Sequence, residues 1–304
     1  MYDIIVIGAG TAGLSAAIYA VRAGKSVLVL EGKNYGGQII NTPSIENYPG
    51  IKNISGFEFA TNLYEQAIEL GAKVEYKKVS GIDKGIEARY KVIIDDKNNE
   101  DCYYECDKVI IATGTINRKL GIDREDELIG KGVSYCATCD GAFYRGKDVA
   151  VIGGGSTALE DATFLSNYCN KVYVIHRRDS FRGEDTLVNV LKEKDNVEFI
   201  LDSVVTSLNG GDILSSIDVT NLITKEVSNI ELNGVFIAIG QVPKNEGFVD
   251  IIDVDEYGYI VAGEDCKTTR EGIYVAGDCR TKKVRQLTTA AADGAMAALA
   301  ACEE

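Results

Sequence analysis

The sequence is poor in several residue types, and each shortage narrows what the protein can be. Its 304 residues include one histidine, His176, no tryptophan and three prolines. A Ser/His/Asp or Cys/His catalytic apparatus, and most zinc sites, would require that single histidine. No apolar run approaches the roughly 18–20 residues of a membrane span. We therefore expect neither a metal centre nor a membrane partner.

Positive charge is also scarce. The chain has 32 Lys and Arg against 46 Asp and Glu, a formal net charge of −14. This balance argues against an extended phosphate-binding surface, and so against nucleic acid as a partner. The N-terminal residues MYDIIVIGAG enter a strand at once and leave no room for a signal peptide, which predicts a cytoplasmic protein. In that compartment the eight cysteines are not expected to form a disulfide framework.

Length and composition favour two domains. A chain of 304 residues is long for one hydrophobic core. It contains no low-complexity segment and no long Pro- or Gly-rich linker. The domain boundaries are therefore predicted at short crossings of the chain, near residues 113–117 and 240–244.

Two βαβ units occur in the same register. Residues 2–31 predict a buried strand, a helix and a second buried strand. The same pattern returns over residues 147–179. When the first glycines of the two loops are aligned, Glu31 falls opposite His176. The sequence thus predicts an α/β protein with two Rossmann-like dinucleotide-binding domains, each with three layers, two of strands and one of helices (ββα).

Shorter segments predict the remaining elements. Residues 90–114 predict a hairpin that returns into a buried strand, with its turn at residues 96–101. Two similar strands are predicted within residues 232–240 and 270–278. The small residues of the tail, 286–304, predict a packed helix.

The first glycine loop is Gly8-Ala9-Gly10-Thr11-Ala12-Gly13. In such a loop the first glycine makes a tight turn, the second lets the backbone approach a pyrophosphate, and the third packs the helix against the strand. The helix N-terminus adds N–H donors and the positive end of its dipole. Glu31, at the end of the next strand, can accept hydrogen bonds from a ribose diol but would repel a 2′-phosphate. The first nucleotide is therefore predicted to be FAD or NAD.

The second glycine loop is Gly153-Gly154-Gly155-Ser156-Thr157-Ala158, with alanine in place of the last glycine. Where the first unit has an acid, the second has His176-Arg177-Arg178 and then Arg182. Guanidinium groups match phosphate in geometry and stay charged. Two charge-assisted bonds of about 1.5 kcal/mol each would favour NADPH over NADH by on the order of 100-fold. The alternative is that these residues form only a solvated charged turn.

Two cysteines, Cys136 and Cys139, are separated by two residues. A zinc site would want four ligands, and the other close pair, Cys102 and Cys106, lies in the predicted hairpin. A purely structural disulfide is also not expected, because closing so small a loop removes little conformational entropy from the unfolded chain. The pattern favours a redox-active disulfide that accepts electrons from a flavin and exchanges with a partner disulfide.

The location of this pair agrees with a redox role. Cys136 precedes the second glycine loop by 17 residues (153 − 136), so the pair belongs to the same domain as that loop. Thiolates that leave during exchange need a source of protons, and no second histidine exists. Asp140, next to Cys139, is the candidate general acid; the alternative is a simple turn or cap residue.

With these residues in place, the chain resembles the low-molecular-weight thioredoxin reductases over essentially its whole length. The other type of flavin disulfide reductase carries a more widely spaced cysteine pair just after the first βαβ unit, and the corresponding GGQIINTPS has no cysteine. The matching motifs are GAGTAG (8–13), GGQ (36–38), ENYPG (46–50), CATCDG (136–141), GGGSTALE (153–160), HRRDSFR (176–182), AIGQVP (238–243), VAGD (275–278) and RQL (285–287).

The resemblance implies a homodimer whose FAD domain is made of both chain ends, residues 1–114 and 245–304, around an inserted NADPH domain, residues 115–244. It implies that FAD is held by Gly8, Gly10, Ala12, Gly13, Glu31, Gly36, Gly37, Gln38, Asn47, Thr113, Gly114, Asp278, Arg285, Gln286 and Leu287. It implies that NADPH is held by Gly153, Gly155, Ser156, Thr157, His176, Arg177, Arg178, Arg182 and Gly240. Two departures are Ser156, where many members have Asn or Asp, and Cys279, where an aliphatic residue is common.

The resemblance also implies an activity. NADPH would reduce FAD, and electrons would pass to the Cys136–Cys139 disulfide and on to thioredoxin or a related small dithiol protein. Cys139 would lie next to the flavin and Cys136 would attack thioredoxin, with rotation of the NADPH domain between the half-reactions. A rival hypothesis takes electrons from ferredoxin, for which the basic residues Lys282, Lys283 and Arg285 offer a patch. The intact second loop, its arginines and the negative net charge argue against that rival. A non-catalytic nucleotide-sensing protein would not need the cysteine pair.

Overall fold

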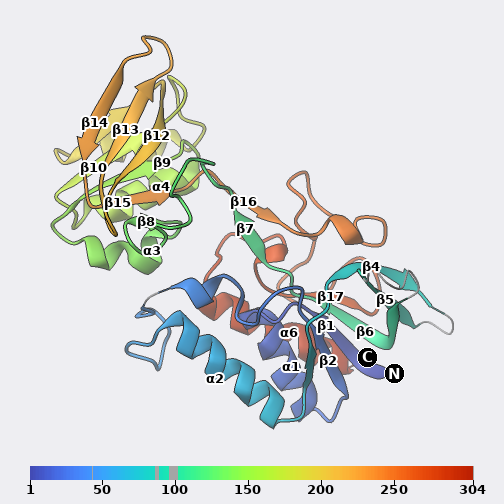
Figure 1. Cartoon of the computed structure of the whole chain (residues 1–304). Coiled ribbons are helices and arrows are strands. Elements are labelled where there is room, and N and C mark those ends of the chain that lie inside the picture. The colour runs from blue at the N-terminus through green and yellow to red at the C-terminus, as the bar shows by residue number, and fades with distance from the viewer. Residues whose placement is uncertain (43, 86–88, 96–101, 304) are drawn as a thin grey trace. The chain divides into compact units, whose positions relative to one another are not determined.

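The computed structural model describes residues 1–42, 44–85, 89–95 and 102–303, and the chain forms two compact units (Figure 1). Unit 1 comprises Met1–Ile116 and Val242–Glu304, and unit 2 comprises Asn117–Gln241. Both divisions fall inside the predicted crossings. They differ from the predicted domain boundaries by two or three residues.

Unit 1 is built on a seven-stranded sheet of order β3-β2-β1-β6-β5-β4, with β17 also paired to β6. β1, β2, β3, β6 and β17 are parallel, whereas β5 runs antiparallel to β4 and β6. The turn predicted at residues 96–101 lies outside the described residues. The strands are β1 (Tyr2–Ile7), β2 (Val27–Leu30), β3 (Lys73–Glu75), β4 (Val79–Lys84), β5 (Tyr90–Ile94), β6 (Tyr103–Ile111) and β17 (Ile273–Val275).

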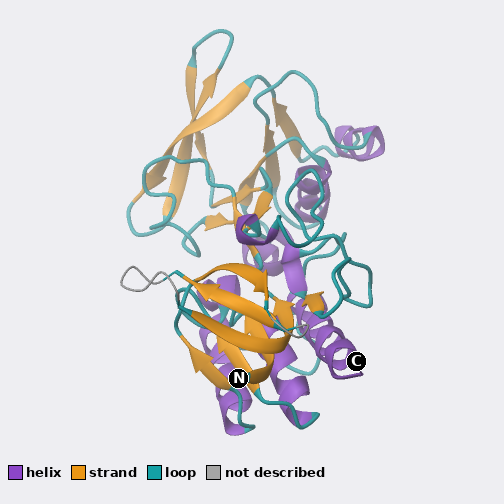
Figure 2. Ribbon diagram, turned by 90° about the vertical axis from the view of Figure 1, so that its right-hand side faces the viewer, coloured by secondary structure: helices purple, strands orange, loops and turns teal. Residues whose placement is uncertain are grey.

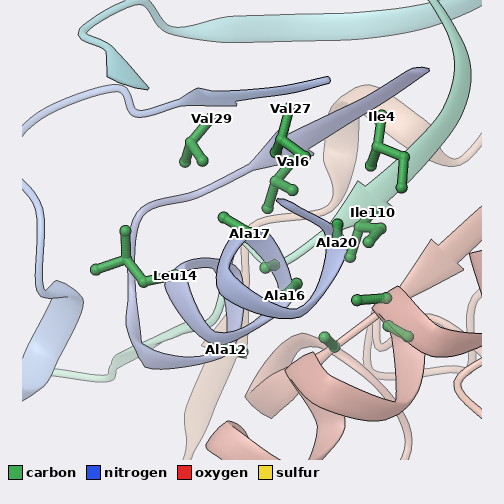
Figure 3. Close-up of a cluster of buried hydrophobic side chains, with 14 of the residues drawn as sticks. Ile4, Val6, Ala12, Leu14, Ala16, Ala17, Ala20, Val27, Val29 and Ile110 are labelled. Carbon is green, nitrogen blue, oxygen red and sulfur yellow. The ribbon is translucent and has the colours of Figure 1, made fainter. Parts of the chain in front are cut away.

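Alternating side chains of β1 bury both faces of this sheet. Ile4 and Val6 pack on one side with α1 and α6 (Figure 3). Ile5 and Ile7 pack on the other side with β4, β5 and residues 248–260. A strand buried on both faces reads as a continuous apolar run, which is why YDIIVIG predicted it from sequence.

Three α-helices accompany this sheet (purple in Figure 2). α1 begins directly after the first glycine loop, and its alanines allow α6 to approach closely. Ser55 caps α2, because its side chain accepts a hydrogen bond from the Glu58 N–H. The helices of unit 1 are α1 (Thr11–Arg22), α2 (Gly56–Glu69), α6 (Leu287–Glu303) and the 3₁₀ turns η1 (Gly37–Asn41), η3 (Glu246–Phe248) and η4 (Gly277–Cys279).

Unit 2 contains a parallel five-stranded sheet of order β11-β10-β9-β15-β8 and an antiparallel sheet of order β12-β13-β14. Its helices are α3 (Ala137–Asp140), α4 (Ser156–Ser166), α5 (Asp185–Lys192) and η2 (Gly141–Tyr144). Its strands are β8 (Val133–Ser134), β9 (Asp148–Ile152), β10 (Lys171–Ile175), β11 (Val197–Ile200), β12 (Ser203–Gly210), β13 (Leu214–Asn221), β14 (Val227–Glu231) and β15 (Gly234–Ile237).

The central strand β9 separates two cores, as β1 does in unit 1. Val149 and Val151 face α4 and α5. Ala150 and Ile152 face the antiparallel sheet. Unit 2 is therefore a layer of helices, a parallel sheet and an antiparallel sheet. The predicted α/β class is confirmed, although the sequence analysis did not identify strands β12 to β14.

The chain passes between the units twice, and these two segments pair with each other. β7 (Thr115–Asn117) and β16 (Gln241–Pro243) form a two-stranded sheet. Over the part of the chain that the structure describes, no helix combines the length and apolarity needed to cross a membrane.

Candidate functional site

The first glycine loop joins β1 to α1, and each glycine has its own steric reason. Gly8 has a φ of 110°, and a Cβ there would lie 2.4 Å from the Ala112 carbonyl oxygen. A Cβ on Gly13 would lie 1.8 Å from the Gly8 oxygen, so helix and loop touch. A Cβ on Gly10 would meet nothing within 4 Å. The backbone at Gly10 therefore has space beside it, and no side chain caps the N-terminus of the 12-residue helix α1 that follows. This arrangement fits a phosphate group.

Glu31 follows β2 and is fixed by the backbone of both neighbouring loops. Its Oε2 accepts a hydrogen bond from the Ala9 N–H at 2.8 Å, and its Oε1 accepts one from the Lys33 N–H at 2.8 Å. Each carboxylate oxygen can accept a further bond. Glu31 is thus held in place beside the glycine loop with acceptor capacity for a ribose diol.

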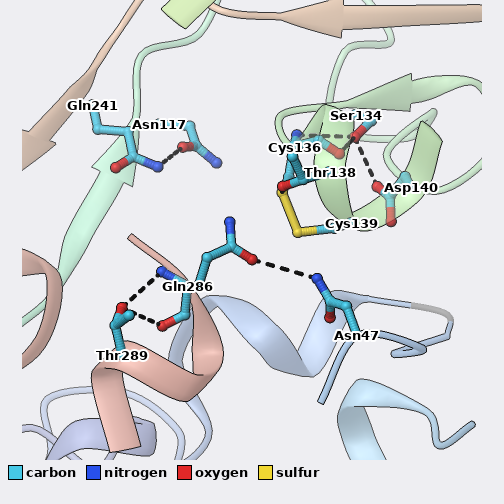
Figure 4. The surroundings of a disulfide bond; sticks show 10 residues. All are labelled: Asn47, Asn117, Ser134, Cys136, Thr138, Cys139, Asp140, Gln241, Gln286 and Thr289. Atoms are coloured by element: carbon cyan, nitrogen blue, oxygen red, sulfur yellow. Dashed lines mark hydrogen bonds between the residues drawn. A yellow bond between two sulfur atoms is a disulfide. The ribbon is translucent and has the colours of Figure 1, made fainter. Parts of the chain in front are cut away.

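The predicted residues Gly36 and Gly37 lie beside this loop, whereas Gln38 and Asn47 bond to other segments of unit 1. Gly36 has a φ of 96°, and its N–H donates to the Ala9 oxygen at 2.8 Å. Gly37, with a φ of 66°, begins η1. The Gln38 amide donates to the Thr115 oxygen. The Asn47 amide donates to the Gln286 side chain at 3.4 Å (Figure 4), which joins the first segment of unit 1 to the second.

The second segment of unit 1 supplies a buried carboxyl. Asp278 lies on η4, and its Oδ1 is buried with no hydrogen-bond partner among the described residues. Burial raises the pKa of this carboxyl. Arg285 donates to the Asp278 backbone oxygen at 3.3 Å and stacks over the Tyr259 ring, with its guanidinium 4.3 Å from the centroid. An orphaned buried acceptor of this kind fits the hydroxyl of a bound cofactor. Leu287 begins α6 just beyond.

Asn245, which the sequence analysis missed, joins the predicted residue Thr113 to the backbone of Gly258 and Cys279. Its Oδ1 lies 3.0 Å from the hydroxyl of Thr113, which precedes Gly114. Its amide donates to the Gly258 and Cys279 backbone oxygens at 2.8 and 3.0 Å. Gly114 has a φ of 65°, in the left-handed region that favours glycine. An asparagine that lies in the sequence between a lysine and a glutamate gives no sign of this role.

A buried ion network supports the η4 loop and was also missed. The Asp293 carboxylate accepts hydrogen bonds from the Gly277 N–H at 3.0 Å, from the Arg280 guanidinium at 2.9 Å and from the Lys282 ammonium at 2.8 Å. Burial alone would raise the pKa of Asp293, but the bonds from Arg280 and Lys282 lower it. The Lys282 side chain is only 6% exposed. It is therefore not available to the basic patch that the ferredoxin hypothesis used.

The second glycine loop repeats the geometry of the first. A Cβ on Gly153, where φ is 155°, would lie 2.4 Å from the Ala238 oxygen. A Cβ on Gly155 would meet nothing within 4 Å. α4, with 11 residues, begins at Ser156, and Ala158 is fully buried where the first loop has its third glycine. This loop also fits a phosphate group.

His176 lies beneath this loop. A Cβ on Gly154 would come within 2.2 Å of the imidazole Cε1, so only glycine fits above it. The imidazole stacks on Phe181 with centroids 5.5 Å apart. Burial lowers its pKa, and its Nε2 has no hydrogen-bond partner among the described residues. The single histidine is thus a support for the loop, and its predicted contact with NADPH stays a prediction.

The three predicted arginines are exposed and lie on one turn. Arg177 and Arg178 follow β10, and the Arg182 N–H donates to the Gly154 oxygen at 2.7 Å. That bond ties the turn to the glycine loop. Of the other predicted residues, Thr157 is exposed on α4, and Gly240 has a φ of 108° and accepts from the Arg118 N–H at 3.0 Å.

The cysteine pair is joined in a disulfide. The Cα atoms of Cys136 and Cys139 lie 5.3 Å apart; Cys136 is the N-cap of α3 and Cys139 is the third residue of this single turn (Figure 4). The other six cysteines are free thiols. Among the described residues, no group of three or more His, Cys, Asp or Glu side chains could hold a metal ion.

Asp140 and Ser134 are bonded to each other beside the disulfide (Figure 4). The Ser134 hydroxyl donates to Asp140 Oδ2 at 2.7 Å and accepts from the Cys136 N–H at 3.1 Å. Asp140 Oδ1 is buried without a hydrogen-bond partner in the described part of the chain. Burial raises the pKa of Asp140, and the bond from Ser134 opposes the rise. Ser134 was not predicted, although it stands two residues before the cysteine pair.

Comparisons with known proteins identify the family of the chain. Residues 2–294 match the pyridine nucleotide-disulphide oxidoreductase family. The thioredoxin reductase of Treponema pallidum is 41% identical over 301 residues, 99% of this chain and 96% of that one. A 34.2 kDa protein in the rubredoxin operon of Clostridium pasteurianum is 41% identical over 301 residues, 98% of this chain and 96% of that one.

Solved structures give the same answer. Thioredoxin reductase from Streptococcus pyogenes MGAS5005 is 40% identical and has a TM-score of 0.92, covering 99% of this chain and 97% of that chain. A ferredoxin-flavin thioredoxin reductase from Clostridium acetobutylicum is 29% identical with a TM-score of 0.52, covering 99% and 97%. The chain therefore belongs to the pyridine nucleotide-disulphide oxidoreductases and, among them, to the thioredoxin reductase family.

Proposed function

We propose that this protein is an NADPH-dependent thioredoxin-disulfide reductase that carries FAD. The observation that carries the proposal is the pairing of two like glycine loops with unlike partners, Glu31 in one and the turn of Arg177, Arg178 and Arg182 in the other. A disulfide with an adjacent buried carboxyl shares the unit of the second loop. The net reaction converts NADPH, a proton and a disulfide into NADP⁺ and two thiols.

Unit 1 would hold FAD. The backbone at Gly10 and the N-terminus of α1 would bind the pyrophosphate, and Glu31 the adenosine ribose. Asp278 Oδ1, which has no hydrogen-bond partner among the described residues, would accept a hydrogen bond from a hydroxyl group of the cofactor. The segments 36–47 and 285–287, which Asn47 and Gln286 join, would surround the remainder. FAD, when bound, accepts a hydride from NADPH and passes two electrons to the disulfide.

Unit 2 would hold NADPH. Gly155, Ser156 and Thr157 would receive the pyrophosphate at the start of α4. Arg177, Arg178 and Arg182 would bind the 2′-phosphate, because their exposed guanidinium groups lie on a turn fixed to Gly154. His176 would keep the loop backbone in place from beneath. Gly240 would lie along the nicotinamide half.

The disulfide would then exchange with thioredoxin. After two electrons and two protons open the Cys136–Cys139 bond, the Cys136 thiolate attacks the thioredoxin disulfide and forms a mixed disulfide. One thioredoxin sulfur leaves and takes a proton from Asp140. Cys139 then gives its proton to Asp140 and attacks Cys136, which reforms the first disulfide and releases the second thioredoxin sulfur. That sulfur takes from water the proton that Cys136 released to water when it became a thiolate. A related small dithiol protein would serve equally as the partner.

Two further properties follow from this proposal. Nicotinamide and disulfide belong to one unit and must react in turn with a single flavin in the other, which requires rotation about β7 and β16. A disulfide recycled by NADPH suits the reducing conditions of the cytoplasm, which we propose as the location.

We also propose a homodimer that forms through unit 1. A groove of about 400 Å³ between α1, α2 and α6 is lined by apolar and small side chains, including Ile18, Tyr19 and Leu63. The adjoining Met296 and Leu299 of α6 are exposed by 47% and 44%. An apolar face of this kind is typical of a surface that a second protein covers.

The ferredoxin-dependent alternative has less support. Its basic patch loses Lys282, which is buried against Asp293, and Arg285 is occupied with Tyr259 and the Asp278 backbone. The second glycine loop is intact, with Gly155 open for a phosphate. Both observations favour NADPH as the electron donor.

One anaerobic experiment tests the donor. A slight excess of NADPH is added to the purified protein, and the visible absorbance of the flavin is followed. We expect rapid bleaching with NADPH and slow bleaching with NADH. A flavin that stays oxidised with NADPH and bleaches with reduced ferredoxin would overturn the proposal.

A matched variant tests the disulfide. In Cys136→Ser the flavin should still bleach with NADPH, because hydride transfer does not use this sulfur, while reduction of thioredoxin is lost. Turnover of thioredoxin by this variant at the wild-type rate would exclude Cys136 as the attacking sulfur.

A further inference from the structure

Ser134 connects the sheet of unit 2 to the groups that exchange at the disulfide. It is the last residue of β8, which pairs in parallel with β15 opposite Phe236, and it is only 3% exposed. Its hydroxyl bonds to Asp140 Oδ2 at 2.7 Å and to the Cys136 N–H at 3.1 Å (Figure 4). One side chain anchored in a sheet therefore touches both a cysteine of the pair and the adjacent acid.

The hydroxyl has one proton to donate, and its two possible acceptors are unequal. Asp140 Oδ2 lies at 2.7 Å, whereas the Cys136 carbonyl oxygen lies at 3.4 Å. A hydrogen bond to a carboxylate is shorter and about twice as strong as one between neutral groups. The proton therefore points at Oδ2, and the lone pairs of the hydroxyl receive the Cys136 N–H.

This arrangement makes the two oxygens of Asp140 different. Oδ2 is already an acceptor, while Oδ1 is buried and has no hydrogen-bond partner among the described residues. A proton on Oδ2 would compete with the Ser134 proton, whereas one on Oδ1 would not. The free oxygen is thus the one from which a proton can be given to another atom.

We propose that Ser134 is a positioning residue of the disulfide exchange, which holds Asp140 by Oδ2 so that Oδ1 carries the transferable proton. The inference rests on the proposed function and deepens it. When the substrate disulfide breaks, its leaving thiolate takes the proton from Oδ1 and becomes a thiol, and Asp140 becomes a carboxylate. The Cys139 thiol returns a proton to Oδ1 as its sulfur attacks Cys136.

Other titratable groups face this site and must be separated from Asp140. Tyr144 of η2 has a pKa raised to about 12 by burial and then by the Asp140 charge. Asp161 of α4, the helix packed against α3, has a pKa raised to about 7 by burial and then by Glu160. Tyr168, whose hydroxyl lies near Gly141, has a pKa raised to about 12, with burial as the main cause. Asp161 is the one that titrates in the useful range.

Infrared spectroscopy of the oxidised protein tests the proposal without turnover. Cys136 and Cys139 do not titrate in that form, and the protonated carboxyl band that is absent from Asp140→Asn belongs to Asp140. The Asp161 band is present in both proteins and cancels. In Ser134→Ala the midpoint of the Asp140 band should move up by about one pH unit, the equivalent of a hydrogen bond to a charged group. Ser134→Thr, which keeps a hydroxyl, should restore the wild-type midpoint.

A second variant controls for loosening of the same segment. Tyr135→Phe removes the hydrogen bond from the Tyr135 hydroxyl to the buried Glu125, next to Ser134, and should leave the Asp140 midpoint where it is. Equal midpoints in Ser134→Ala and wild type, or equal shifts in Ser134→Ala and Tyr135→Phe, would overturn the proposal. If Ser134→Ala does not fold, the Ser134→Cys variant replaces it, because a thiol of similar size donates only weakly.

Kinetics then connect the site to exchange. The rate at which thioredoxin reoxidises the reduced enzyme should decline at high pH as Asp140 loses its proton. In Ser134→Ala that decline should begin at a higher pH, by a similar shift, with NADPH-dependent bleaching of the flavin unchanged. A wild-type enzyme that does not reduce thioredoxin would refute the proposed function, and the infrared result would still decide the role of Ser134.

Discussion

The two βαβ units place the same loop in the same way and then differ at one point. In each, the first glycine lies against the residue that follows a neighbouring parallel strand, Ala112 after β6 or Ala238 after β15, and the glycine two residues later faces open space. After the second strand, unit 1 has a carboxylate bonded to the loop, and unit 2 has a buried imidazole followed by exposed arginines. We therefore expect the loop to determine where a phosphate binds, and the residues 23 positions further on to determine which nucleotide is bound.

The largest expected effect comes from adding one methyl group to the first loop. Gly13→Ala would place a Cβ 1.8 Å from the Gly8 oxygen, so helix and loop must separate. We expect a loss of more than about 4 kcal/mol in stability and loss of bound flavin. Thermal unfolding and the flavin content of the purified protein measure both.

The matched control reverses the change in the second loop. Ala158→Gly should cost only about 1 kcal/mol, the usual difference between the two residues in a helix, and leave NADPH binding within a few-fold. If Gly13→Ala retained flavin and stability, the steric difference between the loops would be of no consequence.

A buried carboxyl in each unit should make the stability of the protein depend on pH, in opposite directions for the two units. The pKa of Asp161 in unit 2 is raised from 3.8 to about 7, chiefly by burial. A raised pKa contributes stability that is complete below about pH 4 and is lost as the pH rises to about 7. Relative to wild type, Asp161→Asn should therefore gain on the order of 3 kcal/mol between pH 4 and pH 8. Thermal unfolding across this range measures the difference.

Asp293 of unit 1 provides the opposite case. Its pKa is lowered by Arg280 and Lys282 against the effect of burial. Its contribution is present above pH 3.8 and disappears as the pH falls further, so Asp293→Asn should lose stability at neutral pH. A pH profile of Asp161→Asn parallel to that of wild type would show that the two carboxyls do not differ.

Removing positive charge from the turn of residues 176–182 tests which nucleotide the second loop prefers. Arg177→Ala with Arg178→Ala should lower the preference for NADPH over NADH by on the order of 100-fold, because two bonds to the 2′-phosphate are lost. The KM for NADH should hardly change. Arg145→Ala is the control, since that arginine packs over Tyr168 away from the turn. An unchanged ratio of the KM values would make residues 176–182 a solvated turn.

The smallest effect is expected at Glu31. Glu31→Gln keeps an acceptor for one backbone N–H but loses the charge that strengthens the bonds from Ala9 and Lys33. We expect about a tenfold weaker affinity for FAD, roughly 1.4 kcal/mol. Titration of the flavin-free protein with FAD, followed by fluorescence, measures it. No change would mean that the carboxylate supports neither the loop nor the ribose.

The sequence predicted what local patterns encode. Strands such as β1 and β9 are continuous apolar runs, and each is followed by glycines at fixed spacing, so both βαβ units and their register could be predicted. The antiparallel strands β12 to β14 were not identified individually, although Gly210 and Gly211, at the turn from β12 to β13, are a hairpin signal in the sequence. The chain divides into its two units after residues 116 and 241, within the two short crossings that were predicted because the sequence has no long linker.

The functional residues follow the same rule. Cys136, Cys139 and Asp140 are adjacent in sequence and were identified together. Asn245 and Asp293 act on residues far from them in sequence, and no motif marks them. His176 was predicted to contact NADPH from its register with Glu31, and that contact stays a prediction. Its packing against Gly154 could not be predicted from the sequence. Which way a side chain points depends on the packing of the whole unit, and a single sequence does not contain that information directly.

The insertion of unit 2 into unit 1 has a consequence for biosynthesis. Unit 2 is one uninterrupted segment, whereas unit 1 needs β17 beside β6 and α6 against α1. As the chain emerges from the ribosome, unit 2 has all its strands before unit 1 has its last one. We expect the inserted domain to fold first during translation, while the first 116 residues wait for the final 63 to be made.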